Sequence, residues 1–284
     1  MIERIRTYGA FVRFSHSVFA LPFALAGALL AAQRAPLTPA KLVWILVAMV
    51  SARSAAMGFN RIADRRIDAL NPRTANRELP RGAMSYGEAV AFVIVASAAF
   101  LFAAYELNPL CLALSPVALA IVFWYSLAKR YTTWTQFFLG LSVAVAPVGG
   151  WLAVGGGAGW EPWILALAIG TWVGGFDVLY ACQDLEFDRA QRLRSIPVRF
   201  GVRMSLAISR VMHLIAVTCL LALAWVAPLG GIYVAGVAIV AALLAYEQSL
   251  VSPDDLSQVK RAFDLNGYVG ILYLTVLAVA LYVR

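Results

Sequence analysis

Apolar residues fall along this chain in long blocks of about 20, separated by shorter polar segments. An α-helix needs about that many apolar residues to cross the hydrocarbon core of a bilayer. The pattern therefore predicts an all-α, polytopic membrane protein with nine transmembrane helices. We expect the spans at Ser17–Gln33, Leu42–Asn60, Glu88–Leu107, Leu110–Leu127, Gln136–Val154, Trp163–Ala181, Ser205–Ala227, Leu229–Tyr246 and Leu265–Val283.

Composition supports a membrane protein and excludes other classes. Of 284 residues, 62% are hydrophobic and 13% are charged, and the mean hydropathy is +0.79. A soluble domain carries roughly twice that charged fraction, so a soluble enzyme and a disordered chain are excluded. Cys111, Cys182 and Cys219 are an odd number without metal-ligand spacing, which argues against a disulfide scaffold. No linker or repeat interrupts the chain, and we expect a single domain over residues 1–284.

The basic residues predict the orientation in the membrane. The net charge is +8, and of the 23 Lys and Arg residues 18 lie on one side of the nine-span arrangement and three on the other. Lys and Arg gather in cytoplasmic loops, so we expect the N-terminus inside a cell (inner) membrane and the C-terminus outside. Basic loops of this kind also explain the charge without a nucleic-acid partner. The only partner that composition predicts is the lipid bilayer.

Two acidic segments lie on the predicted inner side. In the first, Asn60, Asp64 and Asp68 are spaced four residues apart and would share one face of a continuing helix. In the second, Asp177, Asp184 and Asp188 would likewise share a face if the helix continued. Asp177 falls within an apolar span, where an ionisable side chain points to a functional site.

The residue types in these segments favour a magnesium diphosphate ligand. Facing helix ends rich in carboxylates suit Mg²⁺, which binds hard oxygens together with substrate phosphates. Arginines alternate with the first acidic face, and Lys129 and Arg130 end the fourth span on the same side. Arg and Lys bind phosphate oxygens, although the same cations would also serve as inner-side anchors.

Arg53 is a separate case because it lies within the apolar part of the second span. It precedes Asn60 by seven residues, which places it two helical turns deeper on the same face. A buried guanidinium needs an anionic partner, and no acid lies within a turn of it in sequence. The partner is either a carboxylate of another helix, such as Asp177, or an anionic substrate group, and we favour a substrate carboxylate.

Nine spans with two inner aspartate segments resemble the UbiA superfamily of intramembrane prenyltransferases, over essentially the whole chain. The family's first motif, N-D-x-x-D-x-x-x-D, is matched from Asn60 to Asp68. Its second, D-x-x-Y-x-x-x-D-x-x-x-D, is complete and includes Tyr180, and a Y-x-x-x-K-R element begins at Tyr125. The resemblance implies a bundle of nine helices around a central cavity that opens to the cytoplasmic side.

One departure from the family pattern concerns Arg61, which replaces the leading aspartate of the first motif. That change and the segment Asn71-Pro72-Arg73-Thr74-Ala75-Asn76-Arg77 are similar to the branch called 4-hydroxybenzoate polyprenyltransferase-like. Part of that branch prenylates 1,4-dihydroxy-6-naphthoate in the futalosine route to menaquinone. Both acceptors are hydroxyaryl carboxylates, so Arg53 does not separate them.

The resemblance implies a Mg²⁺-dependent transfer of a polyprenyl chain from polyprenyl diphosphate to a ring carbon of an aromatic hydroxy acid, in ubiquinone or menaquinone biosynthesis. Asp64, Asp68, Asp184 and Asp188 are the expected catalytic residues. The expected metal ligands are these four with Asn60 and Asp177. The expected substrate-binding residues are Arg53, Asn60, Arg65, Tyr125, Lys129, Arg130, Asp177 and Tyr180.

Other functions remain open from the sequence. A transporter or channel would use charges along a path through the membrane, whereas here they gather at one face. A prenyltransferase of the same fold could instead take haem, chlorophyllide or glycerol phosphate as acceptor. A scaffolding membrane protein would leave the polar motif residues without a role.

Overall fold

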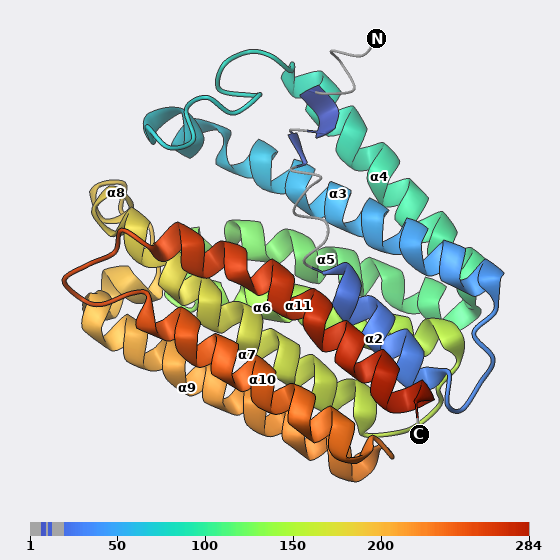
Figure 1. Ribbon diagram of the computed structural model, residues 1–284. Coiled ribbons are helices and arrows are strands. Elements are labelled where there is room, and N and C mark those ends of the chain that lie inside the picture. Colours follow the sequence, from blue (N-terminus) through green and yellow to red (C-terminus); the bar gives the residue numbers. More distant parts are fainter. Residues whose placement is uncertain (1–6, 10, 13–19, 284) are drawn as a thin grey trace.

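The computed structural model describes residues 7–9, 11–12 and 20–283, and these form a bundle of long helices (Figure 1). Eight helices are long and apolar enough to span a membrane, among the residues described. The bundle comprises α2 (Leu21–Ala31), α3 (Pro39–Leu70), α4 (Tyr86–Leu107), α5 (Pro109–Tyr131), α6 (Thr135–Val154), α7 (Glu161–Ala181), α9 (Ile196–Val226), α10 (Gly230–Ser249) and α11 (Val259–Tyr282). The all-α, multi-pass architecture predicted from the sequence is confirmed.

The nine predicted spans correspond to α2 and the eight longer helices. The shorter apolar helix α2 falls inside the predicted first span, of which residues 17–19 lie outside the described part of the chain. The other predicted spans fall within the observed helices to within a residue at their ends. The largest difference is α3, which continues ten residues beyond the predicted Asn60 and ends at Leu70, before Asn71 and Pro72.

Local sequence explains where these helices begin. Thr38 caps α3 by accepting from the backbone N–H of Lys41 at 3.3 Å, and a proline follows the cap. Ser85 and Glu88 form a reciprocal capping box at the start of α4. The chain order alternates direction, so the ends of α3, α5, α7 and α10 and the start of α11 lie at one end of the bundle. We call this the motif end, because it holds Asp64, Asp68, Asp184 and Asp188.

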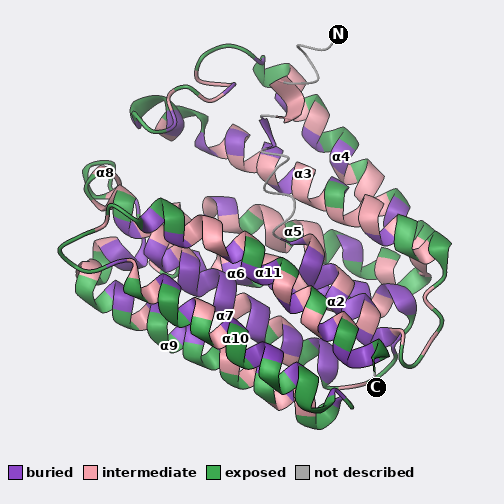
Figure 2. Ribbon diagram, in the orientation of Figure 1, coloured by how far each residue is buried: buried purple, intermediate pink, exposed green. Residues whose placement is uncertain are grey.

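Helix α7 lies inside the bundle and packs against α6, α9, α11 and α2. Buried positions are frequent along α7 (Figure 2), and its residues Leu165, Ile169 and Trp172 are fully covered. Many apolar side chains of the outer helices are exposed, for example Trp225 at 88%. Outward apolar side chains are expected where a helix faces lipid rather than water. The core of the bundle therefore forms around the helix that carries the second acidic segment.

Small residues let neighbouring backbones approach closely. A Cβ added at Gly150 of α6 would lie 2.0 Å from the carbonyl oxygen of Ala24 on α2, and one at Gly140 would lie 2.1 Å from that of Gly170 on α7. Contacts of this kind are a main means by which helices associate in lipid. Gly149, next to Gly150, has open space at the same position.

The second acidic segment does not continue as one α-helix. Helix α7 ends at Ala181 and is followed by a 3₁₀ turn, η2 (Cys182–Asp184), and a short helix, α8 (Leu185–Ala190). The expectation of a continuous helical face through Asp188 is therefore wrong in its geometry. The tighter winding still leaves the carboxylates near one another, as described below.

Candidate active site

Asp64 of α3 forms the centre of a charged cluster at the motif end. Its side chain is almost fully buried and accepts from two cations in the last turn of α5. Lys129 Nζ lies 2.6 Å from Asp64 Oδ2, and Arg130 Nη2 lies 2.9 Å from Asp64 Oδ1. Arg130 also donates to the carbonyl oxygen of Ala63 at 2.7 Å. The predicted proximity of the Lys129–Arg130 pair to the first acidic segment is thus present.

Asp68, one turn further along α3, is held by the loop that follows the helix. Arg77 Nη1 lies 2.7 Å from Asp68 Oδ1 and 2.8 Å from Oδ2. Thr74 donates its hydroxyl hydrogen to the Asp68 carbonyl oxygen at 3.0 Å. The loop therefore folds back over the end of α3 and brings a cation that the sequence interpretation did not assign.

Arg73 of the same loop joins the two acidic segments. Its Nε and Nη2 donate to Asp184 Oδ1 and Oδ2 at 3.1 and 2.6 Å, and its Nη1 donates to the Tyr180 hydroxyl at 3.1 Å. Partial burial lowers the pKa of Arg73, but the hydrogen bonds and charge of Asp184 outweigh it and raise the pKa above its ordinary value. A fork of this kind is the strongest geometry for binding a carboxylate.

Asp177 and Asp188 differ from the other carboxylates. Neither side chain makes an ion pair or a hydrogen bond with the part of the chain that the structure describes. Asp188 nevertheless lies within the electrostatic influence of Asp64, Asp184, Lys129 and Arg73. The two acidic segments therefore converge on one shared set of cations.

Asn60 and Tyr125 line the first segment on its membrane side. The Asn60 Nδ2 donates weakly to Asp64 Oδ2 at 3.4 Å. Tyr125 lies one turn before Lys129 on α5. Its hydroxyl group interacts electrostatically with Arg53, Asp64 and Arg61. The structure thus brings Asn60 and Tyr125 to the place that the sequence predicts.

Arg53 lies deeper on α3 and has no anionic partner among the residues that the structure describes. It forms no ion pair within the described residues, and its Nε is buried without a hydrogen-bond acceptor. Asp177, considered above as its partner, does not pair with it. A buried guanidinium without an acceptor is expensive, which marks the place where an anionic group would be stabilised.

Arg65 is a predicted substrate-binding residue that the structure turns away from the cluster. Its guanidinium lies over the ring of Tyr86 on α4, 4.6 Å from the ring centroid, and the residue is exposed. Arg61, which replaces the first motif aspartate, is buried and donates its Nε hydrogen to the carbonyl oxygen of Phe11 at 3.3 Å.

The loop residues Asn71, Arg73 and Arg77 were not among the predicted site residues. They lie in the polar segment that directly follows the first motif, and that position is the signal that could have found them. Its hydropathy shows only that the segment leaves the membrane. The hydrogen bonds to Asp68 and Asp184 depend on how the loop folds, which residue spacing does not encode.

The oxygen ligands of the two acidic segments suit a hard divalent cation, but Lys and Arg side chains of the protein pair with three of the carboxylates. Carboxylate and amide oxygens from both segments are the ligands that Mg²⁺ prefers. Within the described residues, no three metal-ligating side chains lie close enough together to hold an ion. Asp64, Asp68 and Asp184 are instead each paired with Lys or Arg. Binding a metal there requires these pairs to open, and an arriving diphosphate provides alternative acceptors for the cations.

Comparison with known proteins shows the family of the chain. Residues 20–280 match the model of the UbiA prenyltransferase family. A 4-hydroxybenzoate octaprenyltransferase of Vibrio parahaemolyticus is 32% identical over 251 residues, which cover 88% of each chain. The apo structure of a UbiA homologue from Aeropyrum pernix is 38% identical, with a TM-score of 0.86 over 93% of this chain and 98% of that one.

A more distant structure shares the fold. The UbiA homologue from Archaeoglobus fulgidus bound to DMAPP and Mg²⁺ is 20% identical, with a TM-score of 0.72 over 96% of this chain and 99% of that one. The family match, which covers most of the chain, and the multi-pass helical fold agree with the resemblance seen in the motifs. This chain belongs to the UbiA prenyltransferase family and is a membrane-embedded prenyltransferase.

Proposed function

We propose that this enzyme transfers a polyprenyl chain from polyprenyl diphosphate to a ring carbon of a hydroxyaryl carboxylate, in a Mg²⁺-dependent step of quinone biosynthesis. The observation that carries the proposal is the position of Arg53, two turns from Asn60, whose buried Nε has no hydrogen-bond acceptor and whose guanidinium has no anionic partner among the described residues. The names of the curated relatives support 4-hydroxybenzoate as the acceptor. The alternative acceptor is 1,4-dihydroxy-6-naphthoate, which offers the same carboxylate to Arg53.

The diphosphate of the donor binds at the motif end. Lys129, Arg130, Arg73 and Arg77 carry four positive charges against the three carboxylates with which they pair. When a diphosphate arrives, these cations turn from the carboxylates to its oxygens, and the carboxylates become free to ligate metal. Tyr180 and Tyr125 are placed to donate hydrogen bonds to the same group. Arg65 takes no part in this binding, because its guanidinium lies over Tyr86.

The metal ligands in this proposal are Asn60, Asp64, Asp68, Asp177, Asp184 and Asp188. Two of them, Asp177 and Asp188, need no ion pair to be broken, since the described residues leave them unpaired. Bound Mg²⁺ supplies charge that stabilises the leaving diphosphate. A solved structure also supports Mg²⁺ as the metal, because the UbiA homologue from Archaeoglobus fulgidus is bound to DMAPP and Mg²⁺.

The chain's own residues account for the remaining steps. The allylic C–O bond breaks with its electron pair passing to the diphosphate oxygen, where Lys129 and Arg130 stabilise the growing charge. The ring carbon ortho to the acceptor hydroxyl bonds to the allylic carbon, and a carboxylate of the cluster takes the ring proton. Arg53 holds the acceptor carboxylate about 10 Å deeper than Asn60, given seven residues of helix rise. This anchoring selects the ring carbon that faces the donor.

The membrane orientation follows from the loop charges. We place the motif end and the N-terminus on the cytoplasmic side of the inner membrane and the C-terminus outside, because 18 of 23 basic residues fall on the motif side. We also treat residues 1–284 as a single prenyltransferase domain. Polyprenyl diphosphate and aromatic acids would then both reach the site from the cytoplasm or the membrane.

The test uses membranes that contain the protein, Mg²⁺ and a labelled polyprenyl diphosphate, with either aromatic acid as acceptor and with EDTA controls. We expect EDTA-sensitive labelling of one acceptor, and loss of that labelling in Asp64→Ala and Asp184→Ala while both proteins still insert. Turnover retained in both variants would sink the assignment of the acidic cluster. Labelling of neither acceptor by the intact protein would refute the acceptor class.

A further inference from the structure

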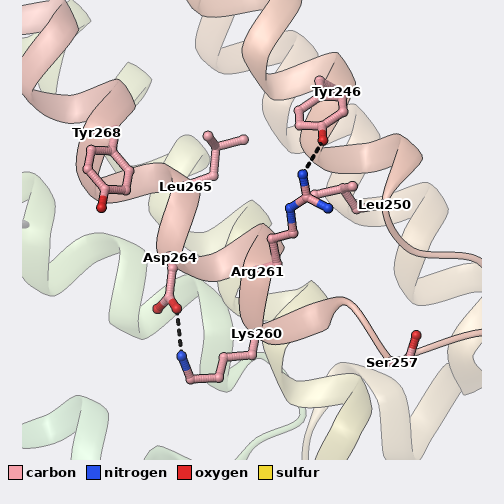
Figure 3. Close-up of a pocket in the computed structure, with 8 residues that line it drawn as sticks. All are labelled: Tyr246, Leu250, Ser257, Lys260, Arg261, Asp264, Leu265 and Tyr268. Atoms are coloured by element: carbon pink, nitrogen blue, oxygen red, sulfur yellow. Dashed lines mark hydrogen bonds and ion pairs between the residues drawn. The ribbon is translucent and has the colours of Figure 1, made fainter.

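A pocket of about 510 Å³ opens between the end of α10 and the start of α11, at the motif end (Figure 3). None of its residues belongs to the charged cluster of the candidate active site. Its charged side chains come from the beginning of α11, and the other lining residues come from α10, α11 and the segment between them. The lining residues are Tyr246, Leu250, Ser257, Lys260, Arg261, Asp264, Leu265 and Tyr268.

Arg261 is the strongest anion-binding group in this pocket. Its Nη2 donates to the Tyr246 hydroxyl at 2.9 Å and its Nη1 donates to Gln258 Oε1 at 3.1 Å. Both acceptors are neutral, and no carboxylate among the described residues lies within ion-pair distance of this guanidinium. A guanidinium held by neutral groups keeps its full charge available for a phosphate.

Lys260 adds a second cation that is easily redirected. Its Nζ lies 2.7 Å from Asp264 Oδ2 one turn along α11, in a pair whose side chains are 82% and 44% exposed. Exposed pairs of this kind contribute at most about 1 kcal/mol, so a phosphate competes with Asp264 at little cost. The pocket therefore offers two cations to one anionic group.

The other half of the pocket is apolar and continues toward the membrane interior. Leu265 and Tyr268 lie one and two turns beyond Arg261 on α11, and Leu250, the residue after α10, lies beside Arg261 (Figure 3). Tyr268 is 74% exposed and Tyr246 is 43% exposed. Tyrosines at the end of a span are typical of the membrane–water boundary. Charge at the bundle end and apolar surface below it match an anionic headgroup with its acyl chains.

We propose that this pocket binds the phosphate headgroup of an anionic phospholipid of the leaflet at the motif end, with the acyl chains against Leu265 and Tyr268. The lipid lies outside the acidic cluster and takes no part in the prenyl transfer. The same two cations would also accept free inorganic phosphate, so the test must separate the two sources. Arg261 and Lys260 provide the headgroup contacts, and Tyr268 provides the contact that only a lipid uses.

The experiment measures retention of dioleoyl-phosphatidylglycerol and dioleoyl-phosphatidylcholine by native mass spectrometry of the detergent-purified full chain. We expect the wild type to prefer phosphatidylglycerol. Arg261→Gln and Lys260→Gln should each lower that affinity about fivefold, the effect of one cation near an anionic lipid. Arg199→Gln is the matched control, an exposed arginine at the same end of the bundle but on α9. Equal retention of both lipids, or unchanged affinity in Arg261→Gln, would overturn the proposal.

Three further measurements distinguish this lipid site from a free-phosphate site and from lipid bound at the active site. Tyr268→Ala should lower phosphatidylglycerol affinity, whereas inorganic phosphate at matched concentration should not stabilise the protein as this lipid does in a thermal shift assay. Phosphate stabilisation equal to that of the lipid would make this a free-phosphate site and refute the lipid. Lys129→Gln should leave phosphatidylglycerol retention unchanged, and a loss there would place the lipid at the active site instead. Arg261 is exposed, so its variant should melt as the wild type does.

Discussion

Arg73 binds both oxygens of Asp184 with two nitrogens of one guanidinium, at 3.1 and 2.6 Å, across 111 positions of the chain. This fork links the loop after the first acidic segment to the second acidic segment, together with a weaker bond that Asn71 Nδ2 of the same loop donates to Asp184 Oδ1 at 3.5 Å. It fixes Asp184 and, through Nη1, the hydroxyl of Tyr180. Arg73 is therefore one of the cations that close the site in this structure, and in the proposed mechanism it turns to the diphosphate.

Arg73→Ala should reduce kcat/KM for the polyprenyl diphosphate about 10- to 100-fold, since a charge-assisted hydrogen bond contributes about 1.5–3 kcal/mol. The loss should fall mainly on the KM for the donor, because Arg73 binds the diphosphate in the proposed mechanism. Steady-state kinetics in membranes measures both constants. Arg189→Ala is the control, an exposed arginine whose one ion pair within the described part of the chain is with the exposed Glu186. Equal losses in the two variants would contradict a specific role.

Substitution of Arg130 and substitution of Arg65 should have clearly different effects on turnover in the same assay. Arg130→Ala removes a cation 2.9 Å from Asp64 and should lower turnover at least about tenfold. Arg65→Ala should stay within about twofold of the wild type, because its exposed guanidinium lies over Tyr86 and outside the charged cluster. An equally severe loss in Arg65→Ala would mean that this side chain moves to the diphosphate when the donor binds.

Arg53 should govern the acceptor and not the donor. Arg53→Gln removes the charge but keeps a polar side chain, and we expect the KM for the aromatic acid to rise about 10-fold or more while the KM for the diphosphate changes little. Arg53→Lys should recover part of the loss, since it restores a point charge without the fork. The measurement is a two-substrate kinetic series. A rise in the donor KM alone would place Arg53 at the diphosphate instead.

Two adjacent glycines of α6 provide a test of the packing. Gly150→Ala puts a methyl group 2.0 Å from the Ala24 carbonyl oxygen, whereas Gly149→Ala meets open space. Overpacking costs about 1–3 kcal/mol, so Gly150→Ala should melt at a clearly lower temperature in detergent. Gly149→Ala should melt as the wild type does. Similar melting of both variants would show that α2 and α6 separate without penalty.

Most of the fold could be predicted from the sequence, because a bilayer imposes one length and one polarity on every span. The predicted spans fail where helices leave the membrane. Hydropathy placed the end of the second span at Asn60, but the helix continues to Leu70, where Asn71 and Pro72 end it. Hydropathy reports the edge of the lipid, whereas helix length depends on backbone hydrogen bonds that continue into water.

The sequence predicts the carboxylates of the site better than it predicts the cations that pair with them. Helical spacing places Asp64 and Asp68 on one face whatever surrounds them. Which arginine faces a carboxylate depends on the neighbouring element. Here Arg65 packs over Tyr86 of α4 instead. The loop after α3 brings Arg73 to Asp184 and Arg77 to Asp68. Long-range contacts of a loop are set by its fold and cannot be read from residue spacing.

The 3₁₀ turn at Cys182–Asp184 makes the second acidic segment less rigid than the first. A 3₁₀ helix turns about 120° per residue and an α-helix about 100°, so three residues add about 60° of rotation between Asp177 and Asp188. The first segment is a rigid rod, because Asn60, Asp64 and Asp68 lie within one unbroken helix. The second has a joint in the middle. Adjustment to ligands of different size should therefore occur at that joint, with α3 serving as the fixed reference edge.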